Sequence, residues 1–131
     1  MNQSKDPQGP LYAVYGTLRK GFGNYKRLLD NEHCVYLGTE RTKPNFTMVS
    51  LGGFPGVIPT GNQEITIEVF RVNSPKVEQQ LDWLEGYPRF YGKTVIDTQW
   101  GKANMYTLDE KSINYPPVPT GDWAVHINKV F

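Results

Sequence analysis

The sequence predicts a small α+β or barrel domain that is rich in short strands and turns. The chain has 131 residues, enough to bury a stable hydrophobic core without disulfide bonds. It contains 13 Gly, 10 Pro, eight Tyr, six Phe and three Trp, a composition that favours strands and turns over long helices. No internal repeat marks a second domain. Residues 1–131 are therefore interpreted as a single domain, in which polar residues 1–9 form a flexible arm.

The first predicted element is a strand at residues 11–15 that ends in a glycine turn. Its residues are apolar, aromatic or small, and Gly16 lets the backbone turn and approach a ligand closely. The amide N–H groups of Gly16, Thr17 and Leu18 are then placed to converge on one oxyanion as a backbone nest. A plain hairpin turn is the alternative interpretation of the same residues.

Between residues 24 and 72 the sequence predicts one short helix and four strands. Asn24 is a candidate N-cap for a helix through about Asn31, with an apolar face formed by Tyr25, Leu28 and Leu29. Strands are expected at 35–41, 46–51, 57–59 and 65–72, the last with the alternation of a half-buried strand. The glycine-rich turn at 52–56 is expected to edge a pocket.

A second helix is predicted over residues 75–85, because its start and stop signals are both present. Ser74 is a suitable N-cap and Pro75 suits the first helical position. Gly86 is the expected residue after the helix, and Pro88 prevents its continuation. The apolar face repeats at helical spacing through Val77, Leu81 and Leu84. The helix is therefore expected to end at Glu85.

Glu85 is the candidate catalytic residue. A carboxylate at the C-terminus of a helix opposes the helix dipole, a mismatch of about 0.3 to 1 kcal/mol. Its apolar neighbours in sequence, Trp83, Leu84, Tyr87 and Phe90, indicate partial burial. Both effects raise the pKa of a carboxyl group, which suits a general base that works near neutral pH. The alternative is a solvated glutamate at a fraying helix end.

The C-terminal third is predicted to contain two strands and an irregular tail. Strands are expected at 93–99 and 103–107, and the proline-rich segment 114–121 is expected to lie extended on the surface. Residues 123–127 either add a last edge strand or dock against the domain. An aromatic side chain such as Tyr115 or Trp123 either shapes the mouth of the pocket or packs onto the strands.

Charge and composition exclude several classes of function. A net charge of +1 argues against a nucleic-acid-binding protein, which needs a strongly basic face. The local basic run of Arg19, Lys20, Lys26 and Arg27 is interpreted as a solvated helix face, with substrate steering as the alternative. The single Cys34 cannot form an intrachain disulfide and is expected to fill space in the core.

The sequence offers no sign of a metal centre or of membrane insertion. His33 and His126 lack the spacing of metal ligands, so we expect no metal and no cofactor. Neither a signal-peptide core nor an apolar run of membrane-spanning length is present in the sequence, which predicts a cytosolic protein without a membrane partner. We expect it to be a monomer.

Four segments together resemble the γ-glutamyl cyclotransferase superfamily, closely its γ-glutamylamine cyclotransferase branch and AIG2-like relatives. They are Tyr15-Gly16-Thr17-Leu18 followed by Arg19-Lys20-Gly21, then Glu68-Val69-Phe70, then Leu81-Asp82-Trp83-Leu84-Glu85-Gly86, and finally Tyr91-Gly92-Lys93. The resemblance spans most of the chain. One departure is Lys93, where the family usually has Arg; a lysine lacks the planar fork that makes bidentate contacts.

The resemblance implies a small mixed β-barrel with one or two short flanking helices. It also implies that Glu85 is the general acid/base and that Tyr15, Gly16, Thr17, Leu18 and Tyr91 bind substrate, with the Tyr91 hydroxyl donating to Glu85 or to substrate. In the family reaction, the α-amine of a γ-glutamyl group attacks its own γ-carbonyl, forms 5-oxoproline and expels an amine. The nucleophile belongs to the small-molecule substrate, so no metal is needed.

Three questions stay open at the level of sequence. The 16–18 loop binds either the α-carboxylate of the substrate or the developing oxyanion. The leaving group is expected to be an amine, with a γ-glutamyl amino acid, glutathione or a γ-glutamylated carrier as alternative substrates. A binding module that uses the same anion pocket without turnover is the alternative from a different class.

Overall fold

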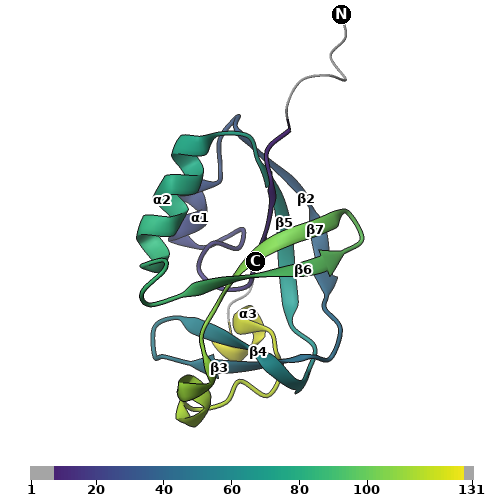
Figure 1. Ribbon diagram of the computed structural model, residues 1–131, viewed down its shortest axis with the longest axis vertical. Coiled ribbons are helices and arrows are strands. Elements are labelled where there is room, and N and C mark those ends of the chain that lie inside the picture. Colours follow the sequence, from purple (N-terminus) through teal and green to yellow (C-terminus); the bar gives the residue numbers. More distant parts are fainter. Residues whose placement is uncertain (1–7, 129–131) are drawn as a thin grey trace, which may run out of the picture.

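The computed structural model describes residues 8–128, which form a five-stranded mixed sheet, a separate two-stranded hairpin and short helices (Figure 1). In chain order the elements are β1 Leu11–Val14, α1 Gly23–Leu28, β2 Cys34–Arg41, β3 Phe46–Ser50, β4 Pro55–Gln63, β5 Thr66–Val72, α2 Pro75–Glu85, β6 Gly92–Thr98, β7 Gly101–Thr107, a 3-10 helix η2 Glu110–Asn114, and α3 Trp123–His126. The helices α1 and α2 lie side by side at one side of the sheet, and α3 lies near the hairpin (Figure 1).

The main sheet has the order β2-β5-β1-β7-β6, and β3 pairs with β4 in the hairpin. Strand β1 is central, antiparallel to β5 and parallel to β7. The end of β7 reaches the hairpin, because the Leu108 amide donates to the Val57 carbonyl over 2.8 Å. The predicted α+β class is confirmed. The predicted mixed β-barrel is not confirmed, because the strands of residues 8–128 form a five-stranded sheet and a separate hairpin.

Both faces of the central strands of the main sheet are buried. Leu11 and Ala13 of β1 face a hydrophobic cluster that includes Trp123, whereas Val14 faces a second cluster that includes Leu81 of α2. Because α2 covers one face, while the hairpin and α3 cover the other, side chains on both faces of the central strands are removed from water. The central position of these strands in the sheet therefore determines which side chains are buried more than the alternation of apolar and polar residues does.

Strand β5 shows the same effect and corrects a prediction. The sequence pattern of residues 65–72 indicates a half-buried strand, but Ile67, Val69, Phe70 and Val72 are all buried. These side chains divide between the two hydrophobic clusters. An alternating pattern predicts a solvent-exposed face only when no other element covers that face. Strand β5 lies between β2 and β1, and both of its faces are covered.

Helix α2 begins and ends where its sequence predicts. The Ser74 side chain accepts a hydrogen bond from the Val77 amide over 3.3 Å at the N-cap. Gly86 adopts the left-handed conformation with φ of 65°, and its amide bonds the Asp82 carbonyl. Glu85 is therefore the last helical residue.

The first helix and the hairpin differ from the prediction in detail. Helix α1 begins at Gly23 with Phe22 in the N-cap position, so Asn24 is inside the helix rather than its cap. The side-chain amide of Asn24 instead donates to the Thr17 hydroxyl over 2.8 Å. The predicted strand at 57–59 extends over Pro55–Gln63; β3 pairs with it at Pro55–Ile58 and again at Gln63, with an irregularity between the two.

The C-terminal segment packs against the hairpin. The Ser50 amide donates to the Pro116 carbonyl over 2.7 Å, and the Val118 amide donates to the Met48 carbonyl over 2.9 Å, so the proline-rich segment lies extended along β3 as predicted. Residues 123–126 form helix α3 rather than an edge strand. The Asp122 side chain caps this helix by accepting from the Val125 amide.

The predictions for the N-terminal arm and for Cys34 agree with the structure only in part. Residues 1–7 of the predicted flexible arm lie outside the described residues. Gly9 belongs to the fold, because its amide donates to Asn73 Oδ1 over 2.7 Å and its carbonyl accepts from Arg71. Cys34 is half-buried in β2 against the second cluster. Among residues 8–128, no helix is long and apolar enough to cross a membrane.

Candidate active site

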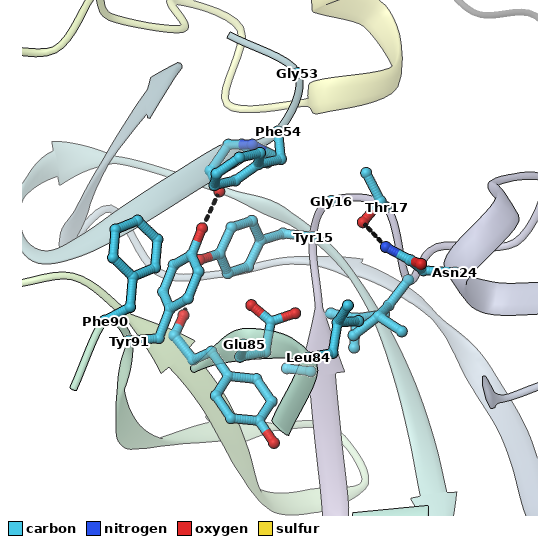
Figure 2. Close-up of a pocket in the computed structure, with 15 residues that line it drawn as sticks. Tyr15, Gly16, Thr17, Asn24, Gly53, Phe54, Leu84, Glu85, Phe90 and Tyr91 are labelled. Carbon is cyan, nitrogen blue, oxygen red and sulfur yellow. Dashed lines mark hydrogen bonds between the residues drawn. The ribbon is translucent and has the colours of Figure 1, made fainter. Parts of the chain in front are cut away.

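A cavity of about 360 Å³ lies where four segments meet (Figure 2). They are the loop after β1, the last turn of α2, the turn before β4 and the residues before β6. Every site residue predicted from the sequence lines this one cavity: Tyr15, Gly16, Thr17, Leu18, Glu85 and Tyr91. Residues as far apart as 15 and 91 are thus brought together by the central position of β1.

Glu85 directs its carboxylate into the cavity (Figure 2). Burial raises the pKa of this carboxyl group from 4.5 to about 7. The apolar surroundings differ from the predicted ones at two residues. Leu84 and Phe90 line the cavity, but Tyr87 does not, and Trp83 is 85% exposed and does not cover Glu85. Tyr106 of β7 takes part in the lining instead.

Gly16 is required by close packing across the cavity. A Cβ atom at this position would lie 2.8 Å from Cδ and 2.9 Å from Cγ of Pro55, which is closer than van der Waals contact allows. The Arg19 amide closes a turn by donating to the Gly16 carbonyl over 3.0 Å. The glycine therefore lets the loop after β1 lie against the first residue of β4.

Arg19 corrects the interpretation of the basic run as a solvated helix face. Its side chain is only 8% exposed; its Nε lies 3.1 Å from Glu68 Oε2 and its Nη1 lies 2.8 Å from Asp122 Oδ1. The second oxygen of Glu68 accepts the Lys20 amide over 2.7 Å. Glu68, the acidic residue of the Glu-Val-Phe segment, thus anchors the loop from the neighbouring strand β5. The other three residues of the run are exposed, Lys20 in the loop and Lys26 and Arg27 on α1.

The two predicted tyrosines use their hydroxyl groups to hold the cavity walls. Tyr15 donates to the Tyr106 carbonyl over 2.8 Å and accepts from the Val57 amide over 3.2 Å. Tyr91 donates to the Pro55 carbonyl over 2.6 Å, so the predicted donation to Glu85 is wrong. Burial raises the pKa of both phenols, which keeps them protonated at neutral pH.

Several lining residues were missed from the sequence. Asn24 has the signature of a helix cap, yet its amide lies beside Thr17 at the cavity (Figure 2). Tyr106 is one of several aromatic residues in predicted strands, and no local pattern sets it apart.

The turn at 52–56 was expected to edge a pocket, and this is confirmed by Gly53, Phe54 and Pro55. Tyr115 and Trp123 do not line the cavity, and Trp123 is a core residue.

Asp82 and Lys93 fasten the last turn of α2 to the sheet. Lys93 Nζ lies 2.8 Å from Asp82 Oδ1, and the same oxygen accepts the Tyr106 hydroxyl over 2.5 Å. The Lys93 ammonium also lies 4.6 Å from the centre of the Tyr87 ring, a cation–π contact. Neither Asp82 nor Lys93 lines the cavity. The lysine that departs from the family pattern thus supports the helix that carries Glu85.

The lining residues define what chemistry the cavity can perform. Burial raises the pKa of the Glu85 carboxyl group to about 7, a value that suits proton exchange near neutral pH. The Thr17 hydroxyl and the Asn24 amide add polar contacts, whereas Ser and Cys are not among the residues that line the cavity. Within residues 8–128 no three His, Cys, Asp or Glu side chains gather as metal ligands. The cavity suits proton transfer on a ligand that supplies its own nucleophile.

The chain is similar to known proteins of one family. A family model described as "Gamma-glutamyl cyclotransferase, AIG2-like" matches residues 12–125. A putative gamma-glutamylcyclotransferase of Vibrio cholerae is 35% identical over 117 residues, a match that spans 89% of this chain and 97% of that protein. Gamma-glutamylaminecyclotransferase B of Danio rerio is 34% identical over 112 residues, spanning 81% of this chain and 58% of that protein.

The fold is shared with solved structures. The crystal structure of an AIG2-like protein from Mus musculus superposes with a TM-score of 0.72 at 21% identity, and the match covers 90% of this chain and 89% of that one. The family match spans the strands and helices that build the cavity, from β1 into α3. The chain therefore belongs to the gamma-glutamyl cyclotransferase, AIG2-like family.

Proposed function

We propose that this protein converts a γ-glutamyl amine to 5-oxoproline and a free amine, with Glu85 as the general acid/base. The observation that carries the proposal is the Glu85 carboxyl group, which points into the cavity with its pKa raised by burial to about 7. A carboxyl group with this pKa exchanges protons efficiently at neutral pH. The names of the relatives support the same reaction class.

The reaction proceeds through proton transfers that Glu85 mediates. The Glu85 carboxylate takes a proton from the substrate's α-ammonium group, and the resulting amine attacks the γ-carbonyl carbon to close a five-membered ring. The tetrahedral intermediate then collapses: the C–N bond to the leaving group breaks, and Glu85 returns its proton to the departing nitrogen. The second proton of the ring nitrogen passes to the regenerated carboxylate and on to solvent, where the released amine takes up a proton.

The loop after β1 positions the substrate for this attack. Gly16, Thr17 and Leu18 line the cavity together with Asn24, and we propose that their backbone amides and the side chains of Thr17 and Asn24 supply its polar side. They hold the α-carboxylate or the oxyanion of the intermediate. Tyr15 and Tyr91 supply rigid walls that keep the substrate bent. Because the attack is intramolecular, holding this bent pose removes much of the entropic part of the barrier.

The test compares wild type with Glu85→Gln on one γ-glutamyl alkylamine, with release of 5-oxoproline measured by mass spectrometry and ligand affinity measured by calorimetry. Glutamine keeps the size of the side chain but cannot accept the proton. The expected loss in turnover is about 10²- to 10⁴-fold, with the affinity for substrate retained. Unchanged turnover in the mutant would assign the base to another group. Binding without turnover in both proteins would identify a binding module.

A further inference from the structure

The cavity has two chemically different sides, with Glu85 between them. On one side the Asn24 side-chain amide donates to the Thr17 hydroxyl over 2.8 Å. On the opposite side lie the aromatic rings of Phe54, Phe90 and Tyr91 (Figure 2). A ligand that reacts at Glu85 therefore extends a polar end one way and meets aromatic carbon the other way.

The aromatic side is open to a ligand at its outer edge. The rings of Phe54 and Phe90 lie with their centroids 6.3 Å apart at an interplanar angle of 67°, and they remain 39% and 50% exposed. Behind them the buried Tyr91 ring packs against Phe90 at 5.0 Å. The backbone holds both phenylalanines, because the Phe90 amide donates to Gly86 and the Phe54 carbonyl accepts from Leu51. These two partly exposed rings, carried on a hydrogen-bonded backbone, provide an apolar surface for a ligand.

The cavity offers no cation to a second carboxylate. Among the described residues that line it there is neither Lys nor Arg. Two cations of the adjoining elements are already paired: Arg19 with Glu68 and Asp122, and Lys93 with Asp82. A carboxylate placed against these rings would lose part of its hydration without an ionic partner among the residues that line the cavity, which is unfavourable.

These observations fix the direction of the substrate, given the function proposed above. The α-amino and α-carboxylate groups of the γ-glutamyl end need the polar side. The leaving amine therefore lies against the aromatic side. We propose that Phe54 and Phe90 form the leaving-group subsite, which accepts amines with an apolar alkyl or aryl chain on the scissile nitrogen and rejects amines with a carboxylate on the carbon next to it. The two phenylalanines act as specificity-determining residues.

Three substrates that differ only in the leaving group test this proposal. γ-Glutamyl-phenethylamine and γ-glutamyl-phenylalanine differ by one carboxylate, and γ-glutamyl-methylamine lacks the ring. For wild type we expect kcat/KM for the phenethylamine compound to exceed both others by about tenfold or more. Phe54→Ala and Phe90→Ala should each reduce this preference over the methylamine compound by about tenfold, because the rate with the phenethylamine compound falls more than the rate with the smaller substrate.

Trp83→Ala is the matched control, because Trp83 is an exposed aromatic residue of α2 that does not line this cavity. It should leave all three rates unchanged, and thermal melting checks that each variant is folded. Equal kcat/KM values for the phenethylamine and phenylalanine compounds would overturn the subsite, as would a Phe90→Ala variant that slows all three substrates equally. A wild type that forms 5-oxoproline from none of the three would instead overturn the function on which the subsite depends.

Discussion

The Arg19 guanidinium and the Glu68 carboxylate form a buried ion pair, 3.1 Å apart, that joins the loop after β1 to strand β5. The other Glu68 oxygen accepts the Lys20 amide. One carboxylate thus fixes both a side chain and the backbone of the loop that lines the cavity. The loop owes its shape to a residue 49 positions later in the chain.

Replacing Arg19 should destabilise the protein strongly. Arg19→Met leaves the carboxylates of Glu68 and Asp122 without their cation. We expect a loss of about 3 to 5 kcal/mol in the free energy of unfolding, measured by urea denaturation. Lys26→Met, at an exposed site on α1, is the control and should change it by less than about 0.5 kcal/mol. Equal stability of the two variants would show that the ion pair does not anchor the loop.

Activity should depend on pH through Glu85. Because burial raises the pKa of this carboxyl group to about 7, the free enzyme has the ionised base only above that pH. We expect kcat/KM to rise about tenfold per unit at acidic pH and to level off above pH 7. The measurement is initial rate of 5-oxoproline release from pH 5 to 8. A pH profile in which kcat/KM levels off already near pH 4.5 would mean that Glu85 is solvated in the working enzyme.

The contribution of Glu85 to the free energy of unfolding should fall as the pH rises, whereas activity rises. The folded pKa of about 7 is higher than the ordinary value of 4.5, so the folded state binds the proton more tightly than the unfolded chain does. This contribution is complete below pH 4.5 and is lost as the pH rises to 7. Glu85→Gln should therefore gain stability relative to wild type between pH 4.5 and 8, by about 1 to 3 kcal/mol. Denaturation curves at both pH values decide this, and a constant difference between the two proteins would contradict it.

Local chemistry made part of the structure predictable from sequence. Ser74, Pro75 and Gly86 encode both ends of α2 through capping, so the position of Glu85 follows from nearby residues alone. The glycine turn before β4 is similarly local. The lining of the cavity by the 15–18 loop and Glu85 was expected from the family resemblance, and the structure places them together.

The errors concern contacts that are distant in sequence. Arg19 has the pattern of a surface residue until Glu68 and Asp122 are brought to it by folding. The Tyr91 hydroxyl bonds Pro55, 36 positions earlier, and no local pattern selects this carbonyl over the nearby Glu85. Burial of both faces of β5 likewise depends on which elements cover the sheet. Tertiary context decides these features, and a single sequence does not encode it locally.

Tyr91→Phe should reduce stability more than activity. The hydroxyl donates to the Pro55 carbonyl over 2.6 Å in a buried setting, so its removal takes this hydrogen bond from that carbonyl. We expect a loss of about 1 to 3 kcal/mol in the free energy of unfolding. The ring that faces the cavity is kept, so turnover per folded molecule should remain within about threefold of wild type. Unchanged melting with a large loss of turnover would instead place the hydroxyl on the substrate or on Glu85.

Gly16→Ala should disturb the cavity through a direct steric clash. The new Cβ would lie 2.8 Å from Pro55 Cδ, and Pro55 is held by its pairing with Ser50 and its bond to Tyr91. Overpacking of this kind costs about 1 to 3 kcal/mol, and displacement of the loop amides should lower turnover by about tenfold or more.

The control and the rescue for Gly16→Ala both follow from the geometry. Gly53→Ala also alters a lining glycine, but an added Cβ there has no neighbour within 4 Å, so stability should change by less than about 0.5 kcal/mol. Pro55→Ala removes the ring atoms Cγ and Cδ that meet the new methyl group. The double variant should therefore be more stable, and turn over faster, than the sum of the two single effects predicts. Strictly additive effects in stability and turnover would show that contact with Pro55 is not the reason for glycine at position 16.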